Sequence, residues 1–574
     1  MSLAEADRLL TQPGSPFEIE DIVVRGVRLR NWKQAPPTLR ELMLLGRQFP
    51  DRTFLVFEDE RASFEAFTRA AIQLSHHLIE RGVRKGDRVA LVMSNLPEWP
   101  VAFFAALITG AIVTPLNGWW TGEELEYAFR DSGAKLAIMD WGRYRRFEDH
   151  VKNCPDLEHI LVARAQGPLG GMTSPLDAVI GPTSAWADLP DRPLPELAIG
   201  PDDDATIFYT SGTTGRPKGA LGTHRAPISA LIVSGYAGAR NFLRRGEAPP
   251  APDPDAPQRR ALLSIPFFHV TGCFSFMCRG IFDGAMIAMT RRFDAEEAMK
   301  IIERERITAF GGVPTIPWQV IEHPNRANYD LSSVEQVAYG GAPAAPELVR
   351  RIKEIWPASA PAIGWGMTET SAVFTSQSAE DYQNRPDSCG PAAPICEMKI
   401  VDPATSRPLP VGEVGELLAK GPNVVKGYWN NPAATAETFI DGWVRTGDLA
   451  RLDSEGFCYI VDRAKDMILR GGENIYSAEV EAALYQHPAV MDAALVPIPH
   501  RTLGEEPGAV VCLISGSTLT EDELRAFVAA KVAGFKVPVR ILFRTEPLPR
   551  NANGKILKNE LKKLFAEGAA PTTA

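Results

Sequence analysis

Residues 209–219 have the composition of a loop that wraps phosphate. They read Tyr-Thr-Ser-Gly-Thr-Thr-Gly-Arg-Pro-Lys-Gly, with three glycines, five hydroxyl side chains and one lysine. Glycine lets backbone N–H groups turn toward an anion, hydroxyls add short donors, and Lys218 adds a positive charge. Gly219 and Ala220 follow the lysine, so the loop differs from the common strand–loop–helix phosphate motif. We expect phosphate contacts from Thr210, Ser211, Gly212, Thr213, Thr214, Gly215 and Lys218.

A second stretch, Gly364–Glu369, could complete a nucleotide site. It reads Gly-Trp-Gly-Met-Thr-Glu. Thr368 can donate a hydrogen bond to phosphate, and Glu369 can hold a Mg²⁺ ion that bridges phosphate oxygens. Trp365 offers a flat aromatic face on which a base can stack. Asp448, in Arg-Thr-Gly-Asp, suits a vicinal diol, because a carboxylate can accept one hydrogen bond on each oxygen.

In type and in order, these motifs resemble those of the adenylate-forming superfamily, which contains acyl-CoA synthetases, beetle luciferases and peptide-synthetase adenylation domains. The matching stretches run from residue 209 to residue 555, and two earlier ones, at 83–89 and 115–117, also fit. The resemblance therefore covers nearly the whole chain. It implies that ATP, Mg²⁺ and coenzyme A are bound. The adenine and ribose contacts that it implies are Gly341, Ala342, Pro343, Gly364, Trp365, Asp448 and Arg463.

The same resemblance assigns roles to residues that are uninformative alone. Lys555, in Pro-Arg-Asn-Ala-Asn-Gly-Lys, matches a lysine that neutralises charge on the α-phosphate and the carboxylate. Lys465 matches the hinge about which a small domain rotates, and Gly471 and Gly472 match backbone that lines a pantetheine tunnel. His269 matches a histidine that faces the acyl carboxylate. The expected catalytic residues are Lys555, Thr368, Glu369, which holds Mg²⁺, and His269.

The expected acyl pocket has small or apolar walls. Its candidate residues are Phe268, Thr271, Cys273, Gly312, Val313, Gly340, Gly366 and Ala372. No cation stands among them, and a buried charge on the substrate would need one. This composition disfavours amino acids and dicarboxylates. It favours a hydrophobic monocarboxylic acid: a medium- or long-chain fatty acid first, an aryl or alicyclic acid second.

Alternating helix and strand patterns must position these residues. Apolar runs predict strands at 88–93, 111–115 and 205–208 and a helix at 99–109. The fold class is therefore α/β. The expected organisation is a large N-terminal domain of layered β-sheets and helices at 1–461, a hinge at 462–466, a small mobile α/β domain at 467–565, and a disordered tail at 566–574.

Composition disfavours several classes of protein. The 574 residues are 45% hydrophobic and carry a net charge of −10, which disfavours a general nucleic-acid role. Two apolar stretches, 99–116 and 261–278, are interrupted by proline and glycine, so we expect buried core rather than a transmembrane segment. The N-terminus does not read as a secretory signal, and the seven cysteines form no CxxC pair. We expect a cytoplasmic protein with reduced thiols, and the sequence is compatible with a homodimer.

The resemblance implies a reaction in two steps: an acid and ATP form acyl-AMP and pyrophosphate, and a thiol then displaces AMP. Coenzyme A is the expected thiol, because only about twenty residues follow Lys555 and no carrier domain fits there. Three alternatives stay open. They are an acyl-AMP ligase that loads a separate carrier protein, a catalytically silent nucleotide-binding regulator, and a luciferase-type oxygenase.

Overall fold

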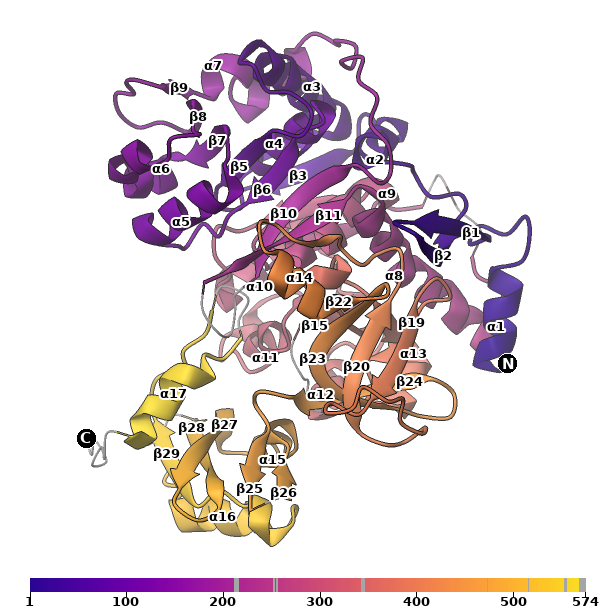
Figure 1. Cartoon of the computed structure of the whole chain (residues 1–574), viewed down its shortest axis with the longest axis vertical. Helices are drawn as coiled ribbons and strands as arrows, with labels where there is room; N and C mark the ends of the chain where they lie inside the picture. Colours follow the sequence, from indigo (N-terminus) through magenta and orange to yellow (C-terminus); the bar gives the residue numbers. More distant parts are fainter. Residues whose placement is uncertain are drawn as a thin grey trace.

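The computed structural model describes residues 1–210, 216–250, 253, 256–341, 346–471, 473–514, 516–551 and 555–566. Three large β-sheets and their helices form a large N-terminal body, and a fourth sheet forms a small C-terminal body at the lower left of Figure 1. The mixed α/β fold, with a large N-terminal and a small C-terminal domain, is confirmed. Of the expected disordered tail at 566–574, Ala566 is the last residue of a helix, Lys558–Ala566, and 567–574 lie outside the described residues.

The first large sheet, which we call the β10 sheet, has a parallel centre and one antiparallel edge. Its strands, in spatial order, are β21 (Gly427–Tyr428), β11 (Lys218–Thr223), β10 (Asp204–Thr210), β6 (Ile112–Pro115), β5 (Arg88–Val92), β7 (Leu136–Asp140), β8 (His159–Ala163) and β9 (Thr173–Pro175). The strands expected at 88–93, 111–115 and 205–208 are confirmed as β5, β6 and β10. Hairpin β10–β11 carries the predicted phosphate loop between its strands.

The second large sheet, the β15 sheet, is parallel except at its two edges. Its strands, in spatial order, are β17 (Thr375–Ser378), β16 (Ala360–Trp365), β15 (Gln336–Gly340), β14 (Ala309–Gly312), β12 (Arg260–Leu263), β13 (Met286–Met289), β3 (Thr53–Phe57) and β4 (Glu60–Ser63). The carboxyl ends of β14, β15 and β16 meet at one edge of the sheet. Open α/β sheets place ligands at such edges.

Helices join the two large sheets and cover their other faces. The largest core cluster packs α3 (Phe64–Glu80) and α4 (Glu98–Ile108) against strands of both sheets. Every residue of α4 is buried, which explains why its sequence shows no polar face. The β15 sheet is covered on its other face by α10 (Ala295–Glu305), α11 (Thr315–Ile321) and α12 (Pro346–Ile355). The β10 sheet is covered by α5 (Gly122–Ser132) and α6 (Trp141–Phe147).

One long helix, α8 (Arg225–Arg244), links the two sheets to the N-terminus. It follows β11 and packs against helix α1 (Leu3–Leu10). The hydroxyl of Tyr236 on α8 donates a hydrogen bond to the carboxylate of Asp7 on α1. Hairpin β1 (Ile19–Val24) and β2 (Val27–Trp32) lies beside them (Figure 1). After α8 and β12, the chain forms a π-helix, η4 (Thr271–Cys278), and helix α9 (Arg279–Asp283).

A six-stranded sheet completes the large body. Its antiparallel strands are β18 (Gly390–Pro391), β24 (Phe457–Arg463), β23 (Trp443–Leu452), β20 (Gly415–Lys420) and β19 (Glu397–Val401), with β22 (Phe439–Ile440) paired to β23. The register of β23 and β24 places Asp448 opposite Arg463. The hairpin of β23 and β24 thereby brings Asp448 and Arg463 together at the end of the sheet.

The small body is built on a five-stranded sheet. Its strands are β26 (Glu473–Ile475), β25 (Ile468–Arg470), β28 (Gly504–Leu513), β27 (Val490–His500) and β29 (Arg540–Arg544), and its helices are α15 (Ser477–Tyr485), α16 (Glu521–Ala529) and α17 (Lys558–Ala566). Residues 464–467 connect β24 of the large body to β25. The short connection overlaps the expected hinge at 462–466.

A small polar contact joins the two bodies beside this connection. The carboxylate of Asp462, on β24, accepts hydrogen bonds from the backbone N–H and the hydroxyl of Ser477, on α15. The ammonium group of Lys558, on α17, donates to the Ser477 hydroxyl at 2.7 Å and pairs with Glu481 at 2.8 Å. All these groups are buried or partly buried. We call this set of residues the 462–477 contact.

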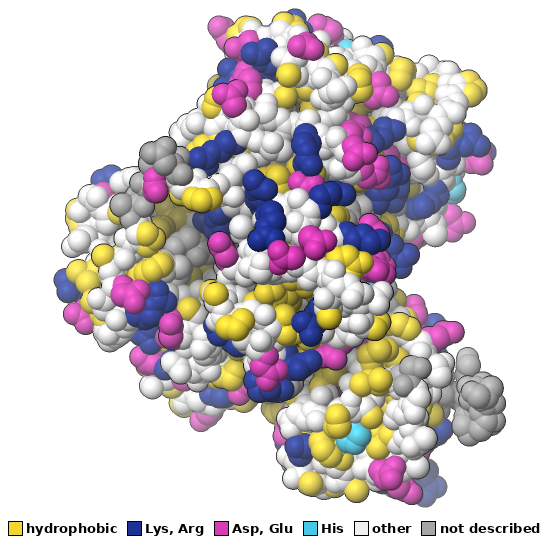
Figure 2. All heavy atoms as spheres, turned by 180° about the vertical axis from the view of Figure 1, so that it is seen from behind, with side chains coloured by type: hydrophobic (Ala, Val, Ile, Leu, Met, Phe, Trp, Pro, Cys, Tyr) yellow, Lys and Arg dark blue, Asp and Glu magenta, His cyan; other side chains and the backbone are white. Residues whose placement is uncertain are grey.

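The surface carries both signs of charge. On the face seen from behind, Lys and Arg gather across the middle of the large body among interspersed acidic side chains, and the small body stands apart at the lower right (Figure 2). In the part of the chain that the structure describes, no helix has both the length and the apolar character needed to cross a membrane. The seven cysteines are buried and unpaired.

Candidate active site

One cleft of about 1430 Å³ collects most of the predicted residues, although they are spread from residue 210 to residue 555. This volume exceeds the roughly 300–1,000 Å³ of a typical single-ligand pocket, so there is room for more than one substrate. The predicted residues that line it are Thr210, Lys218, His269, Thr271, Gly312, Val313, Gly340, Gly341, Gly364, Trp365, Gly366, Thr368, Glu369, Ala372, Arg463, Lys465 and Lys555.

Some predicted residues are placed elsewhere or cannot be placed. Those that lie outside the described residues are Ser211, Gly212, Thr213, Thr214, Gly215, Ala342, Pro343 and Gly472. Those that are described but do not line the cleft are Phe268, Cys273, Asp448 and Gly471. The register of β10 and β11 pairs Thr210 with Lys218, so the two described ends of the phosphate loop both face the cleft.

A sharp turn after β16 presents Thr368 and Glu369. Gly366 begins it, and only glycine fits there, because a Cβ atom would lie 1.5 Å from the carbonyl oxygen of Ala372. The Glu369 carboxylate is buried, which raises its pKa, and it accepts a hydrogen bond of 2.7 Å from the hydroxyl of Tyr428 on β21. The ammonium group of Lys218 lies 5.1 Å from the centre of the Tyr428 ring. Glu369, Tyr428 and Lys218 therefore form one wall of the cleft.

Tyr428 was not predicted as a site residue. The sequence before it, Val-Val-Lys-Gly, predicts only a short strand and a turn, and a lone tyrosine has no spacing signal. What places it in the site is the pairing of β21 with β11, which carries Lys218. A search for tyrosines near a glycine turn would have found it among many false candidates.

The donor set at this wall fits a magnesium ion held mainly by phosphate. Among the described residues there is no group of three acidic, histidine or cysteine side chains that could hold a metal alone. Mg²⁺ in nucleotide sites commonly uses one or two carboxylates, with phosphate oxygens and water as its other ligands. Glu369, beside Lys218 and the end of the phosphate loop, supplies one such carboxylate.

Trp365 and Arg463 hold the carboxylate of Asp448 from two sides. The indole Nε1 of Trp365 donates to Asp448 Oδ2 at 2.8 Å, and Arg463 Nε lies 3.2 Å from Oδ1. Asp448 is buried, while Trp365 and Arg463 line the cleft. The tryptophan ring also packs edge-to-face on Phe374 at 5.7 Å. The indole N–H thus fixes the orientation of an acid that the resemblance assigns to ribose binding.

Replacement of Trp365 by phenylalanine tests this arrangement. The ring is kept but the donor is lost, which leaves a buried carboxylate oxygen without its partner at a cost of about 1–3 kcal/mol. We expect the KM for ATP to rise about tenfold and the KM for the acid to stay within about twofold. Steady-state kinetics with each substrate varied in turn would measure both.

Trp356→Phe is a matched control for this change. Its indole N–H donates to the backbone oxygen of Leu331 at 3.1 Å, and Trp356 does not line the cleft. We expect this variant to lose stability without a change in the KM for ATP. An equal rise in KM in the two variants would show that Trp365 acts only through stability.

Lys555 enters the cleft from the small body. Its backbone N–H donates to Asn551 Oδ1 at 2.9 Å, which fixes the turn that carries it. Burial, followed by repulsion from Arg463 and Lys465, lowers the pKa of Lys555 to about 7. Burial also lowers the pKa of Lys465. Three cations share this end of the cleft, so it is prepared for an anionic ligand.

The pKa of Lys555 predicts a pH dependence. Because a lysine is charged below its pKa, the positive charge is present below about pH 7 in the free protein and is lost above it. We expect kcat/KM for ATP to fall by up to about tenfold per unit as the pH rises above this value. The variant Lys555→Arg keeps its charge and should give a flat profile. The same decline in both would assign the pH dependence to another group.

His269 presents a neutral ring to the cleft. Its Nε2 atom is buried and has no hydrogen-bond partner among the described residues, although the residue as a whole is partly exposed. Burial lowers the pKa of the imidazole to about 3, so the ring is uncharged near neutral pH. A neutral imidazole can donate or accept one hydrogen bond here, depending on its tautomer. The unpartnered nitrogen suits an oxygen of a bound ligand.

The acyl-wall prediction needs one correction. Cys273 is fully buried in the core, and Phe268 packs against the ring of Trp119 at 6.2 Å. More importantly, cations do stand in the wall of the cleft, because Arg259 and Arg279 line its far end together with Asp283. The candidate wall residues named from the sequence contain no cation, and these two arginines were not among them.

Gly471 lies outside the cleft, in the hairpin between β25 and β26. Its φ is +58°, and its N–H donates to the backbone oxygen of Leu503 at 2.8 Å. A Cβ atom there would lie 3.1 Å from Leu503, so a larger residue would be strained. Lys555 and Gly471 thus belong to the same small body, but only Lys555 faces the cleft.

Comparison with known proteins agrees with this geometry. Residues 45–429 match the AMP-binding enzyme family, and residues 479–555 match the AMP-binding enzyme C-terminal domain. Feruloyl-CoA synthase of Amycolatopsis sp. is 34% identical over 90% of this chain and 97% of its own length. A long-chain-fatty-acid–CoA ligase of Bacillus subtilis is 33% identical over 90% and 92%.

A solved structure is also similar. The anthranilate CoA ligase AuaEII in complex with anthranoyl-AMP superposes with a TM-score of 0.81, at 27% identity, over 93% of this chain and 98% of that one. The family match covers well over half of the chain, and the relatives are matched over nearly their full length. The chain therefore belongs to the AMP-binding enzyme family, as a homologue of acyl-CoA synthetases and CoA ligases, and the adenylate-forming assignment made from its motifs is confirmed.

Proposed function

We propose that this protein is an ATP-dependent acid:CoA ligase acting on a hydrophobic monocarboxylic acid, a medium- or long-chain fatty acid first and an aryl or alicyclic acid second. The observation that carries the proposal is that two bodies contribute to one cleft: Lys218 and Glu369 from the large body, and Lys555 from the small one. Anion-binding groups converge there beside small and apolar walls. This combination suits the joining of a carboxylate to a nucleotide.

In the first half-reaction, a carboxylate oxygen attacks the α-phosphorus of ATP, and the bond to pyrophosphate breaks. Lys218, Thr210 and Thr368 hold the phosphates. Lys555 offsets the negative charge that builds up between the carboxylate and the α-phosphate. The neutral imidazole of His269 can donate a hydrogen bond to the carboxylate without lowering its nucleophilicity as a full charge would. Bound Mg²⁺, held by Glu369, supplies charge neutralisation at the phosphates.

In the second half-reaction, the sulfur of CoA attacks the acyl carbon and the bond to AMP breaks. Gly471 lies outside the cleft while Lys555 is inside it. Rotation of the small body about Lys465 would exchange them and bring the backbone at Gly471 and Gly472 to the acyl-AMP. We propose 1–461 and 467–565 as the two domains and 462–466 as the hinge. Such exchange gives each half-reaction its own geometry.

The names of the relatives support the ligase reaction, and they include two classes of acid substrate. One is named for a long-chain fatty acid and others for the aryl acids ferulate and anthranilate. The test is pyrophosphate release across fatty, aryl, bile-type and amino acids, with and without CoA, with products identified by mass. A CoA thioester from one acid class would support the proposal. Acyl-AMP that never reaches CoA would indicate a carrier-protein acceptor, and no release with any acid would favour a silent nucleotide-binding protein.

A further inference from the structure

The cleft continues past the catalytic residues as a channel between α8 and the β15 sheet. On α8 it is lined by Leu231, Gly235, Gly238 and Phe242, which recur at the spacing of one helix face. On the sheet it is lined by alanines of neighbouring strands, namely Ala261, Ala309, Ala338 and Ala362. The channel starts at the carboxyl ends of the strands and reaches Gln336 and Arg260, at their amino ends.

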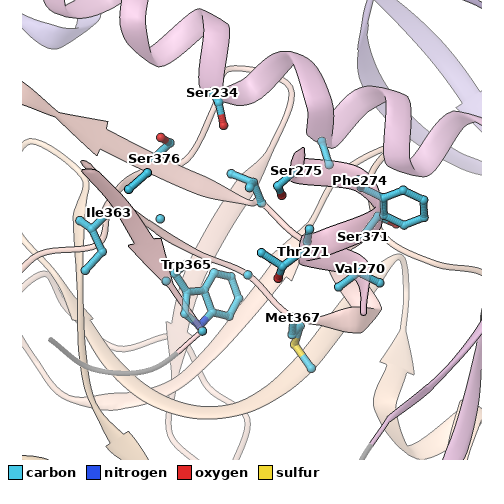
Figure 3. A pocket seen from close by; sticks show the side chains of 18 of the residues that line it. Ser234, Val270, Thr271, Phe274, Ser275, Ile363, Trp365, Met367, Ser371 and Ser376 are labelled. Carbon is cyan, nitrogen blue, oxygen red and sulfur yellow. The ribbon is translucent and has the colours of Figure 1, made fainter. Parts of the chain in front are cut away.

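Small side chains keep this channel open. A helix that covers a sheet normally fills the gap with large apolar residues. Here a Cβ atom added to Gly238 would meet nothing within 4 Å. Ser234 is exposed in the middle of α8, although its neighbours Val233 and Tyr236 are buried. In Figure 3 it points from the helix toward the space bordered by Thr271, Ser275 and Ser376.

The channel is long enough for an extended chain. Gly340 and Gln336, at the two ends of β15, both line the cleft and are four residues apart, which corresponds to about 13 Å along a strand. Each carbon–carbon bond of about 1.5 Å advances a zigzag chain by less than its own length, so on the order of ten bonds are needed to span it. A short acid, anchored at the catalytic end, would not reach Gln336 at the far end.

The walls are not purely apolar. The hydroxyls of Ser234, Thr271, Ser275 and Ser376 face the channel, and none of them hydrogen-bonds to another residue in the described ranges. Such groups need water or ligand oxygens as partners.

Polar groups also surround the far end of the channel. There Arg279 Nε pairs with Asp283 at 2.6 Å, and Arg259 donates to Gln336 at 2.7 Å. Asp283 faces both guanidinium groups, at 2.6 Å from Arg279 and 3.8 Å from Arg259, so the far end is rich in hydrogen-bond donors and keeps a positive charge. A hydroxyl oxygen can accept a hydrogen bond from such donors.

We propose that the acyl substrate is an elongated monocarboxylic acid that carries a hydroxyl group toward its far end, and that Gly238 sets the length that can enter. The carboxylate lies beside His269 and Lys555, the chain passes Gly238, and the hydroxyl reaches the polar far end. This inference rests on the proposed ligase function. It narrows that function to a class of acid distinct from plain fatty acids and from compact aryl acids.

The experiment compares Gly238→Leu with Gly238→Ala and the unmodified protein. Each is assayed for acyl-CoA formation from hexanoate, dodecanoate and ω-hydroxydodecanoate. Leucine fits a helix and fills the empty space, whereas alanine leaves the channel open, so both variants should fold. Thermal unfolding of all three proteins checks this directly.

We expect the unmodified protein to prefer ω-hydroxydodecanoate over dodecanoate by about fivefold in kcat/KM, as one hydrogen bond would give. Gly238→Leu should lower kcat/KM at least tenfold for both long acids and less than about twofold for hexanoate, because a side chain of this size blocks the channel but not its start. Gly238→Ala should match the unmodified protein. The ratios between acids, measured within one variant, are insensitive to a general loss of folded protein.

Several outcomes would overturn the inference. Equal loss for short and long acids in Gly238→Leu, or no loss for either, would show that the chain does not pass Gly238. A preference for dodecanoate over its ω-hydroxy derivative would contradict the polar far end. If one of these outcomes is found while the unmodified protein still converts hexanoate to its CoA thioester, only the inference about Gly238 and the hydroxyl group is wrong. If the unmodified protein converts none of the acids, the ligase proposal itself is overturned.

Discussion

Lys555→Ala is expected to lower the rate of pyrophosphate release by roughly 10²–10³-fold, the loss seen when one preorganised group that stabilises developing charge is removed. Lys555 lines the same cleft as Lys218 and Thr368, and it is the charged group that the described part of the small body contributes there, next to Asn551. Thioester formation from supplied acyl-AMP and CoA should change by less than about threefold, since in the proposed rotation Lys555 has left the cleft by then. Pyrophosphate release and single-turnover thioester formation would be measured on the same preparation.

Lys563→Ala provides the control for this experiment. Lys563 is exposed on α17, a few residues after Lys555, and does not line the cleft. Its removal should change neither half-reaction. If Lys555→Ala slowed both half-reactions equally, the assignment of this lysine to adenylation alone would be wrong, and with it the idea that the small body changes place between the steps.

Glu369→Gln is expected to reduce pyrophosphate release by about 10²-fold and to raise the Mg²⁺ concentration needed for half-maximal rate. The amide keeps the size of the side chain and can still accept from Tyr428, but it has no negative charge for the metal. The carboxylate is buried, so water cannot replace it easily. Initial rates over a range of Mg²⁺ at fixed ATP would measure both effects.

Glu437→Gln is the matched control, because Glu437 lines the same cleft but is exposed. We expect its Mg²⁺ dependence to equal that of the unmodified protein. Tyr428→Phe should give a smaller loss than Glu369→Gln, because it removes only the hydrogen bond at 2.7 Å that orients the carboxylate. If the Glu369→Gln variant had the same Mg²⁺ dependence as the unmodified protein, Glu369 would not be a metal ligand.

The sequence predicted those parts of the site that are contiguous in the chain. Thr368 and Glu369 share a turn, and Lys218 ends a loop of unusual composition, so each could be found from its neighbours. The ends of helix α4 and of strands β5, β6 and β10 were predicted to within one or two residues. Apolar runs of these lengths are compatible with few other secondary structures. A contiguous motif can be found from the sequence because a single turn, loop or strand positions all of its residues.

Contacts between elements could not be predicted in the same way. Tyr428 reaches Glu369 only because β21 pairs with β11. Cys273 was expected in the acyl wall, but η4 is a π-helix, and its wider turn changes which residues face the cleft. Thr271 and Ser275 point into the space instead, and Cys273 packs in the core. Arg279 and Asp283 were missed for the same reason: their position depends on how α9 lies against α8.

The 462–477 contact has a consequence for the balance between orientations of the small body. Asp462 precedes the connection at 464–467 and Ser477 follows it, so rotation about Lys465 would break the hydrogen bonds that Ser477 donates to Asp462. The bond from Lys558 to Ser477 lies within the small body and would be kept. The bonds from Ser477 to Asp462 favour the orientation described here, and neither Asp462 nor Ser477 lines the cleft. Under the proposed rotation, Ser477 and Asp462 would bias the equilibrium between the two orientations. Changes at these two positions would shift how long the protein spends prepared for each half-reaction while leaving every ligand contact intact.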